Sequence, residues 1–127
     1  MSAEPTVYEV VGGQPFFEEL VDRFYDRVER DPELLAVYPQ SQDLGPARRH
    51  LSLFLAEYWG GPPVYSTERG HPRLRMRHAS FAIGAAGVER WLAHMRASVE
   101  EMEPPERARR SLLEYFERAA PMLQNRA

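Results

Sequence analysis

Apolar side chains recur at three- and four-residue steps through most of the chain, and this spacing constrains the fold more than any other feature. Between residues 16 and 28 the repeated positions are Phe17, Leu20, Val21, Phe24 and Val28. Side chains spaced in this way lie on one face of an α-helix. The sequence has no stretch with the two-residue alternation of a half-buried strand, so it predicts an all-α fold.

Similar stripes predict the other helices of the first half. Asp31 followed by Pro32 is typical of the start of a short helix with the aspartate as its N-cap. A stripe from Ala47 to Tyr58 predicts a longer amphipathic helix. Residues 59–70 contain two glycines followed directly by two prolines, which indicates irregular structure.

The second half follows the same pattern. A long helix is predicted to begin between Gly84 and Val88 and to end at the Pro104-Pro105 pair. The last helix carries apolar residues from Ala108 to Leu123, and Pro121 predicts a kink or early fraying near its end. We therefore expect two helix pairs joined by a long irregular link.

The composition is that of one soluble domain. The 127 residues suffice for a single domain and 43% of them are hydrophobic, so we expect one domain over 1–127. Its core is expected at about residues 8–123, with short loose tails such as 125–127. The net charge of −3 argues against nucleic-acid binding, and the lack of cysteine excludes disulfides and thiolate metal sites. The sequence has neither a membrane span nor a signal-peptide pattern, so we expect a cytoplasmic protein without a membrane partner.

The four histidines differ in what they suggest. Two of them lie in HPRLRMRHASF, residues 71–81, where arginines alternate with apolar residues as in a solvated basic face or a phosphate-binding patch. His71 and His78 have no nearby carboxylate to complete a zinc site. His50 is expected on the surface, and His94 on the surface or partly buried. Taken alone, His78 is more typical of a partly buried histidine than of a ligand.

Three aromatic residues with polar groups lie on or beside the apolar stripes. Tyr25, Tyr38 and Trp91 each carry a hydrogen-bond donor that needs a partner when buried. They are compatible with an ordinary core in which each donates to a backbone carbonyl. They are equally compatible with donors that converge on a polar guest. Haem iron with one axial histidine is a guest of that kind.

These residues and their flanking motifs resemble the group II, or O-type, truncated haemoglobins. The resemblance extends over nearly all of the chain from Tyr8 to Leu123, and it rests on motifs in a fixed order and spacing. The motifs are VGG at 11–13, RFY at 23–25, VYP at 37–39, EYWGGP at 57–62, YSTERGHPRLRMRH at 65–78 and RWL at 90–92.

The resemblance implies a two-over-two helical sandwich around haem b, with His78 as the axial ligand of the iron. Ala47 stands where other globins carry a distal histidine, so hydrogen bonding to the ligand would depend on aromatic side chains. The residues implied on the distal side are Tyr25, Tyr38, Trp91, Ala47 and Leu51.

The resemblance also implies how the haem would be held at its edges. Arg77, beside the axial histidine, is expected to face a haem propionate, because guanidinium–carboxylate contacts are directional and charge-assisted. Tyr65 and His71 are weaker candidates for the same edge. The apolar walls are expected to come from Phe54, Leu74, Phe81, Ile83 and Leu92.

The implied function is reversible binding of dioxygen and other diatomic ligands. Three donors near a partly negative bound oxygen predict slow release, which suits a sensor, scavenger or redox enzyme better than oxygen transport. Peroxidase-like activity or detoxification of nitric oxide or oxygen is the enzymatic alternative, and a haem-free helical interaction module is the third. The implied partners are the gases and an unknown reductase, and a monomer or a homodimer is expected.

Overall fold

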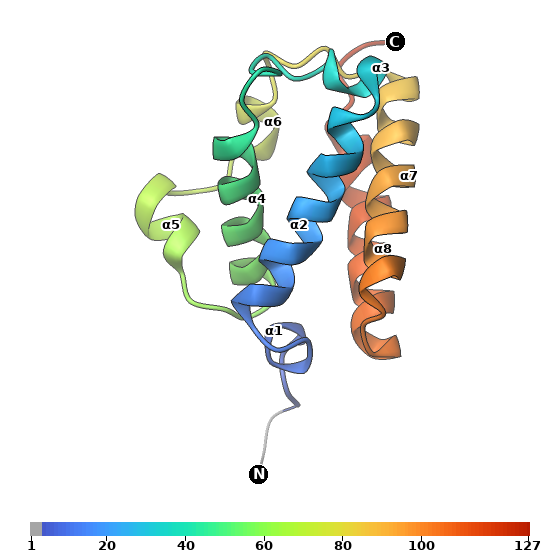
Figure 1. The fold of residues 1–127 in the computed structure, drawn as a ribbon. Helices are drawn as coiled ribbons and strands as arrows, with labels where there is room; N and C mark the ends of the chain where they lie inside the picture. The colour runs from blue at the N-terminus through green and yellow to red at the C-terminus, as the bar shows by residue number, and fades with distance from the viewer. Residues whose placement is uncertain (1–3) are drawn as a thin grey trace.

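The computed structural model describes residues 4–127, and within them it contains eight α-helices and no strand (Figure 1). The predicted all-α class is therefore confirmed. The helices are α1 (Val7–Val10), α2 (Gln14–Glu29), α3 (Pro32–Leu35), α4 (Gly45–Tyr58), α5 (Val64–Arg69), α6 (Leu74–Arg77), α7 (Ala85–Met102) and α8 (Glu106–Met122).

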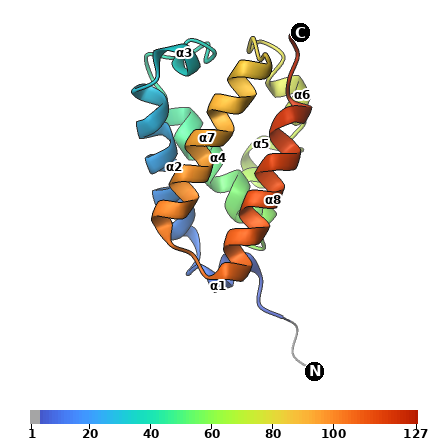
Figure 2. The same ribbon diagram turned by 90° about the vertical axis from the view of Figure 1, so that its right-hand side faces the viewer.

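Four long helices form two packed pairs. Helix α2 packs on α4, α7 packs on α8, and the pairs meet where α2 contacts α7. Figures 1 and 2 show α2 and α4 on one side and α7 and α8 on the other, with α3 and the C-terminal segment at the same end. This arrangement is the predicted two-over-two sandwich.

The apolar stripes become the core, but not uniformly. On α2, the side chains of Phe17, Leu20, Phe24 and Val28 are fully buried. On α4, α7 and α8 several stripe residues stay only half-buried. These residues face a cavity instead of packed atoms, as described below. They include Leu51, Phe54, Trp91 and Tyr115.

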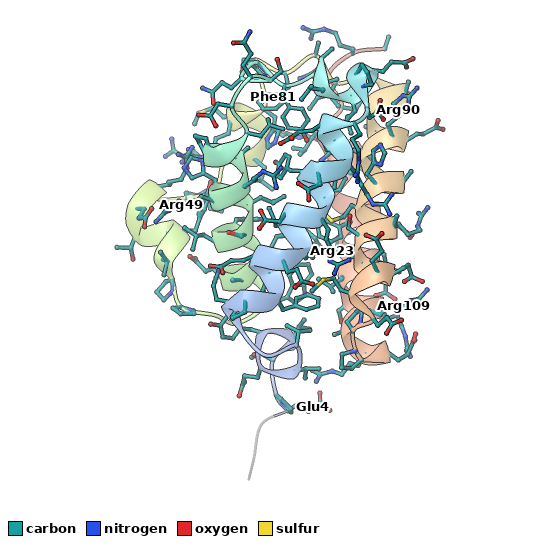
Figure 3. The ribbon with its side chains drawn as sticks, viewed as in Figure 1. Glu4, Arg23, Arg49, Phe81, Arg90 and Arg109 are labelled. Atoms are coloured by element: carbon teal, nitrogen blue, oxygen red, sulfur yellow. The ribbon has the colours of Figure 1, made fainter. Side chains whose placement is uncertain are left out.

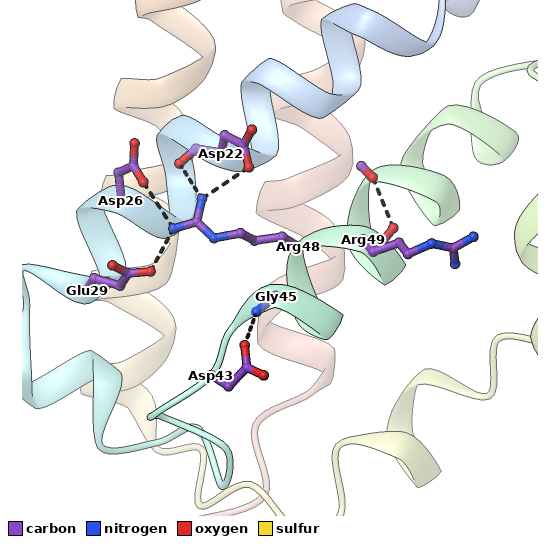
Figure 4. Close-up of polar contacts among 8 residues, drawn as sticks. Asp22, Asp26, Glu29, Asp43, Gly45, Arg48 and Arg49 are labelled. Carbon is purple, nitrogen blue, oxygen red and sulfur yellow. Dashed lines mark hydrogen bonds and ion pairs between the residues drawn. The ribbon is translucent and has the colours of Figure 1, made fainter.

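Arg48 of α4 forms ion pairs with three carboxylates of α2 (Figure 4). Its guanidinium donates to Asp22, Asp26 and Glu29, which lie at steps of three to four residues along α2. The N···O distances are 3.1, 3.0 and 2.7 Å. In Figure 3 other charged side chains, such as Arg23 and Arg109, spread over the outer faces of the helices.

A pair of glycines lets α1 dock against the end of α4. Gly60 has a φ of 108°, and a Cβ there would lie 2.6 Å from the Thr6 side chain. A Cβ on Gly61 would lie 2.6 Å from the Tyr8 ring and 2.8 Å from the Ala56 carbonyl oxygen. Any larger residue would push α1 away, which explains the GG of the EYWGGP motif.

Most predicted helix boundaries agree with the structure. Asp31 caps α3 by accepting from the Leu34 amide at 3.2 Å, and α7 begins at Ala85. Pro104 and Pro105 separate α7 from α8. Helix α8 continues through Pro121 and ends one residue later, at Met122.

Two predictions for less regular segments were wrong. Residues 64–69 form helix α5, because Glu57 of α4 accepts from the Ser66 amide at 2.9 Å and from the Ser66 hydroxyl. The tail is also less loose than predicted. The Asn125 and Arg126 amides both donate to the Ile83 carbonyl at 2.9 Å, and the Asn125 carboxamide accepts from the Ile83 amide. Within residues 4–127, no helix is long and apolar enough to cross a membrane.

Candidate functional site

A cavity of about 600 Å³ lies among α2, α4, α7, α8 and the segment that contains α5 and α6. Its walls are mostly apolar, with a few polar groups, as is usual for small-molecule and cofactor sites. Twelve of the residues predicted for the site line it: Tyr25, Tyr38, Ala47, Leu51, Phe54, Tyr65, Leu74, Arg77, His78, Phe81, Ile83 and Trp91.

Two predicted residues are not brought to the cavity. Leu92 is half-buried on α7 but does not line the cavity. His71 is exposed, and its Nδ1 accepts from the Arg73 amide at 3.1 Å. The His71 ring thus serves the turn before α6. This placement does not support the predicted position of His71 near a haem propionate.

His78 directly follows α6 and is partly buried in the wall. Its Nδ1 lies 2.7 Å from the carbonyl oxygen of Leu74, one turn earlier. A carbonyl can only accept, so this contact assigns the proton to Nδ1 and leaves the lone pair of Nε2 available to a metal. The backbone of α6 therefore sets the tautomer of the imidazole.

The Asn125 side chain holds the segment that follows His78. Its Nδ2 donates to the Phe81 carbonyl at 2.8 Å and to the His78 carbonyl at 3.3 Å. The ring of Phe81 lies 5.0 Å from the His78 ring and 5.5 Å from the Tyr38 ring, measured between centroids. Phe81 thus connects the histidine to the aromatic cluster across the cavity.

That cluster is formed by Tyr25, Tyr38 and Trp91, which come from α2, the corner after α3, and α7. The rings of Tyr25 and Tyr38 are 5.9 Å apart, and Phe24 lies 4.9 Å from Trp91. Tyr25 is only 5% exposed. The polar groups of the cluster are in contact with one another, since Tyr38 interacts with both the Tyr25 hydroxyl and the Trp91 indole.

Burial and these contacts change the pKa values of the two tyrosines. Burial raises the pKa of Tyr25 to about 12, while its contact with Tyr38 and the charge of Arg48 oppose the rise. Burial and the proximity of Tyr25 hold the pKa of Tyr38 well above its usual range, and the Trp91 contact opposes this. Tyr38 therefore lies between Trp91 and Tyr25 in one group of polar contacts. Both phenols keep their protons at neutral pH.

Arginines surround one edge of the cavity. Arg77 directs its donors to backbone carbonyls, with Nε 2.7 Å from the oxygen of Pro72 and one terminal nitrogen 2.7 Å from that of Arg69. Arg69 places one terminal nitrogen 3.0 Å from His50 Nε2, while its buried Nε has no hydrogen-bond partner. Both guanidiniums lie about 6 Å from the centre of the Tyr65 ring.

Arg69 was not predicted for the site, and His50 was predicted in the wrong place. Both line the cavity, whereas His50 was expected on the surface because Arg48 and Arg49 flank it. Burial and the neighbouring Arg69 charge lower the pKa of His50, so its imidazole stays neutral at pH 7. Helix α5 brings Arg69 over this face of α4, and that helix was not predicted from the sequence.

A polar cluster outside the cavity holds α7 against α3. Asp31 accepts from His94 at 2.8 Å and from Arg90 at 3.2 Å, and its side chain is 10% exposed. The His94 hydrogen bond is the main cause of a pKa of Asp31 below its usual range. Since His94 lies one turn after Trp91, this cluster fixes the register between Trp91 and the corner that carries Tyr38.

Comparison with known proteins agrees with this architecture. The model of the bacterial-like globin family matches residues 6–125. The group 2 truncated haemoglobin YjbI of Bacillus subtilis is 39% identical over 95 residues, which cover 75% of this chain and 70% of that protein.

Solved structures show the same likeness. The haemoglobin of Chloroflexus aurantiacus superposes with a TM-score of 0.92 at 50% identity, over 97% of this chain and 100% of that one. The group II truncated haemoglobin of Bacillus anthracis gives a TM-score of 0.91 at 34% identity, over 98% and 95% of the two chains.

The chain therefore belongs to the bacterial-like globin family. The resemblance to group II truncated haemoglobins inferred from its motifs is confirmed. Membership of this family implies a haem and the binding of diatomic gases such as oxygen.

The residues present fit a haem. The cavity offers an imidazole with a free Nε2, and it is mostly apolar around that group. The unpartnered Nε of Arg69 is a buried donor at the cavity edge, which suits a carboxylate of the kind that haem carries.

Proposed function

We propose that the chain binds haem b through His78 and reversibly binds dioxygen and other diatomic ligands in the distal half of the cavity. The observation that carries this proposal is the Nδ1 contact of His78 with Leu74 within a cavity that also holds three aromatic donors. When bound, the haem iron supplies the open coordination position at which a gas ligand binds.

On the proximal side, the chain holds the imidazole in one tautomer and one orientation. Leu74 fixes Nδ1, and Asn125 fixes the two carbonyls on either side of the turn to Phe81. Arg69 is better suited than Arg77 to bind a haem propionate. The Nε of Arg69 has no hydrogen-bond partner, whereas Arg77 already donates to backbone carbonyls.

On the distal side, the chain supplies donors and excludes water. Tyr25 is deeply buried, and its high pKa keeps its hydroxyl a donor. Trp91 and Tyr38 are already in contact, so they would act on a ligand as a connected unit and not as separate groups. Hydrogen bonds to a partly negative oxygen slow its release, so we expect slow dioxygen dissociation.

The same donors make a redox reaction the second candidate. Donors that stabilise partial negative charge on oxygen would equally assist peroxide activation or the detoxification of nitric oxide. Turnover of the reduced protein with oxygen, nitric oxide and peroxide separates these reactions from simple binding. A Tyr25→Phe variant run beside it shows which reaction uses the distal hydroxyl.

The proposal is tested first by the absorption spectrum of the purified protein. The protein purified with added haem should show a strong Soret band and a ferrous spectrum with one histidine ligand. His78→Ala should lose the band or need added imidazole to restore it, whereas His71→Ala should keep it. A wild-type protein that binds no haem would leave only a helical interaction module.

A further inference from the structure

Charge is segregated along this chain, and two segments of it contain no aspartate or glutamate. Residues 69–88 and 118–127 contain six arginines and no aspartate or glutamate. The rest of the chain carries the other ten arginines against all nineteen acidic residues. The net charge of −3 is thus the sum of a cationic part and a strongly anionic part.

The two acid-free segments lie together in space. The Asn125 and Arg126 amides donate to the Ile83 carbonyl, and Arg75 Nε donates to the Met122 carbonyl at 3.2 Å. Figure 2 shows the C-terminal segment beside α6. We call the surface formed by α6 and residues 118–126 the basic face.

The exposed arginines of this face are not neutralised. Within residues 4–127, eight arginines elsewhere form ion pairs with carboxylates, for example Arg48, Arg49 and Arg109. In the same described residues, Arg73 and Arg75 have no carboxylate partner and both are exposed. Unpaired charges on one face create a field that attracts an anionic partner.

The basic face also has an apolar centre. A groove of about 420 Å³ runs between α6 and the end of α8, lined by Leu74, Met76, Ala119, Met122 and Leu123 with Arg73 and Arg75. Met76 is 59% exposed and Met122 is 56% exposed. Methionine and arginine are enriched at protein interfaces, and such interfaces usually have an apolar centre and a polar rim.

This groove is adjacent to the proposed haem site. Leu74, Ala119 and Leu123 line both the groove and the large cavity, so they form the wall between them. Leu74 also provides the carbonyl that contacts His78. A partner seated in the groove would be separated from the cavity by a single layer of side chains.

We propose that the basic face is the docking site for an acidic electron-transfer protein that reduces the haem. The proposal rests on the proposed haem function, because dioxygen binding requires ferrous iron. In the step, one electron leaves the reduced centre of the partner, which is oxidised, and the ferric iron becomes ferrous. No atom changes place. Small, charge-steered interfaces are typical of redox partners.

The test uses the haem-loaded full chain and a plant-type ferredoxin as an acidic one-electron probe. Binding of oxidised ferredoxin is measured by isothermal titration at low and high salt, and reduction of the ferric protein by reduced ferredoxin is followed by stopped flow. The variant Arg73→Glu/Arg75→Glu is compared with Arg30→Glu/Arg110→Glu. The control changes the net charge equally at two exposed arginines off this face that form no ion pair within residues 4–127.

We expect Arg73→Glu/Arg75→Glu to weaken binding and slow reduction by about tenfold or more, and to remove most of the salt dependence. The control should change either quantity far less. An equal loss in both variants would attribute the effect to net charge and overturn the proposal. So would binding of the wild type to phosphatidylserine vesicles without binding to ferredoxin.

Dithionite separates this proposal from the proposed function. It is a small reductant that needs no docking site, so it should reduce all three proteins to the same ferrous spectrum. Failure of dithionite to give a ferrous haem spectrum contradicts the haem function itself. Normal reduction by dithionite, with ferredoxin rates that are alike in all three proteins, contradicts only the docking site.

Discussion

The two walls of the cavity are built in different ways. The distal wall takes Tyr25 and Trp91 from long helices whose stripes also form the core, and its donors contact one another. The proximal wall takes His78 from the end of a four-residue helix, in a segment held by hydrogen bonds from Arg77 and Asn125 to backbone carbonyls. Packing fixes the first wall, and polar contacts to the backbone fix the second.

The difference predicts different responses to mutation. A connected group of donors shares its task, so loss of one member weakens the function without abolishing it. The proposed iron ligand, His78, follows a short helix and would have no substitute. Changes in the proximal wall should therefore be all-or-none, and those in the distal wall graded.

The largest expected effect is that of His78→Ala. Within residues 4–127, His50 is the other histidine in the cavity wall, and Arg69 occupies its Nε2. We expect loss of stable haem binding, measured by the Soret band and by haem retention on gel filtration. Added imidazole should restore the band. A His78→Ala protein with a normal histidine-ligated spectrum would show that the proximal wall is as redundant as the distal one.

Trp91→Phe tests the graded effect that we expect for changes in the distal wall. Phenylalanine keeps most of the apolar volume and removes the indole N–H that we propose donates to a bound dioxygen. A hydrogen bond to a charged or partly charged acceptor contributes roughly 1.5–3 kcal/mol, so dioxygen should dissociate about ten- to a hundredfold faster. Stopped-flow dissociation is the measurement, and carbon monoxide, a poor acceptor, is the control.

Equal changes for both gases would mean that Trp91 acts through its bulk. Tyr38→Phe and the double variant complete the test. Since Tyr38 contacts both other members of the cluster, the double variant should lose less than the two single effects combined. Strict additivity would contradict the connected cluster.

The arginines at the cavity edge give a smaller effect. Arg69→Met removes the unpaired Nε, and we expect haem loss to an apo-globin acceptor to quicken by about tenfold with a near-normal spectrum. Arg77→Met removes hydrogen bonds to the Pro72 and Arg69 carbonyls, so it should also lower the thermal stability of the apoprotein. If both variants lose stability alike, the division of roles between them is wrong.

The smallest effect concerns the cluster that supports the distal wall. Because the folded pKa of Asp31 is depressed, its stabilisation is present above the unfolded pKa of about 4 and is lost as pH falls through the folded value. Asp31→Asn should lower the melting temperature at pH 7 and flatten its decline below pH 4. Asp26→Asn, at a largely exposed partner of Arg48, is the control. Parallel melting curves for wild type and Asp31→Asn would contradict the role of this cluster.

The sequence predicted the long helices well, because a period of 3.6 residues is visible wherever one face is buried. Phe17 to Val28 on α2 and Val88 to Val99 on α7 are examples. Helix α5 was not predictable in this way. It has six residues, and its formation depends on Glu57, nine residues before Ser66. Contacts between distant residues leave no local pattern.

The same limit explains which residues of the candidate site could be predicted from the sequence and which could not. The motifs indicated His78 and the three aromatic residues, and the structure places all four around one cavity. His50 and Arg69 were missed because their burial arises from the packing of α5 on α4. His71 resembled a site residue by its neighbours, yet its ring accepts from the Arg73 amide.

The high pKa values of Tyr25 and Tyr38 have a physiological consequence. A distal histidine would change charge near neutrality and make gas affinity follow the acidity of its surroundings. Indole does not titrate, and the two phenols titrate far above pH 7. We therefore expect the hydroxyl groups of Tyr25 and Tyr38 to keep their protons, and their part in gas binding to stay the same, when the surroundings of the protein become more acidic.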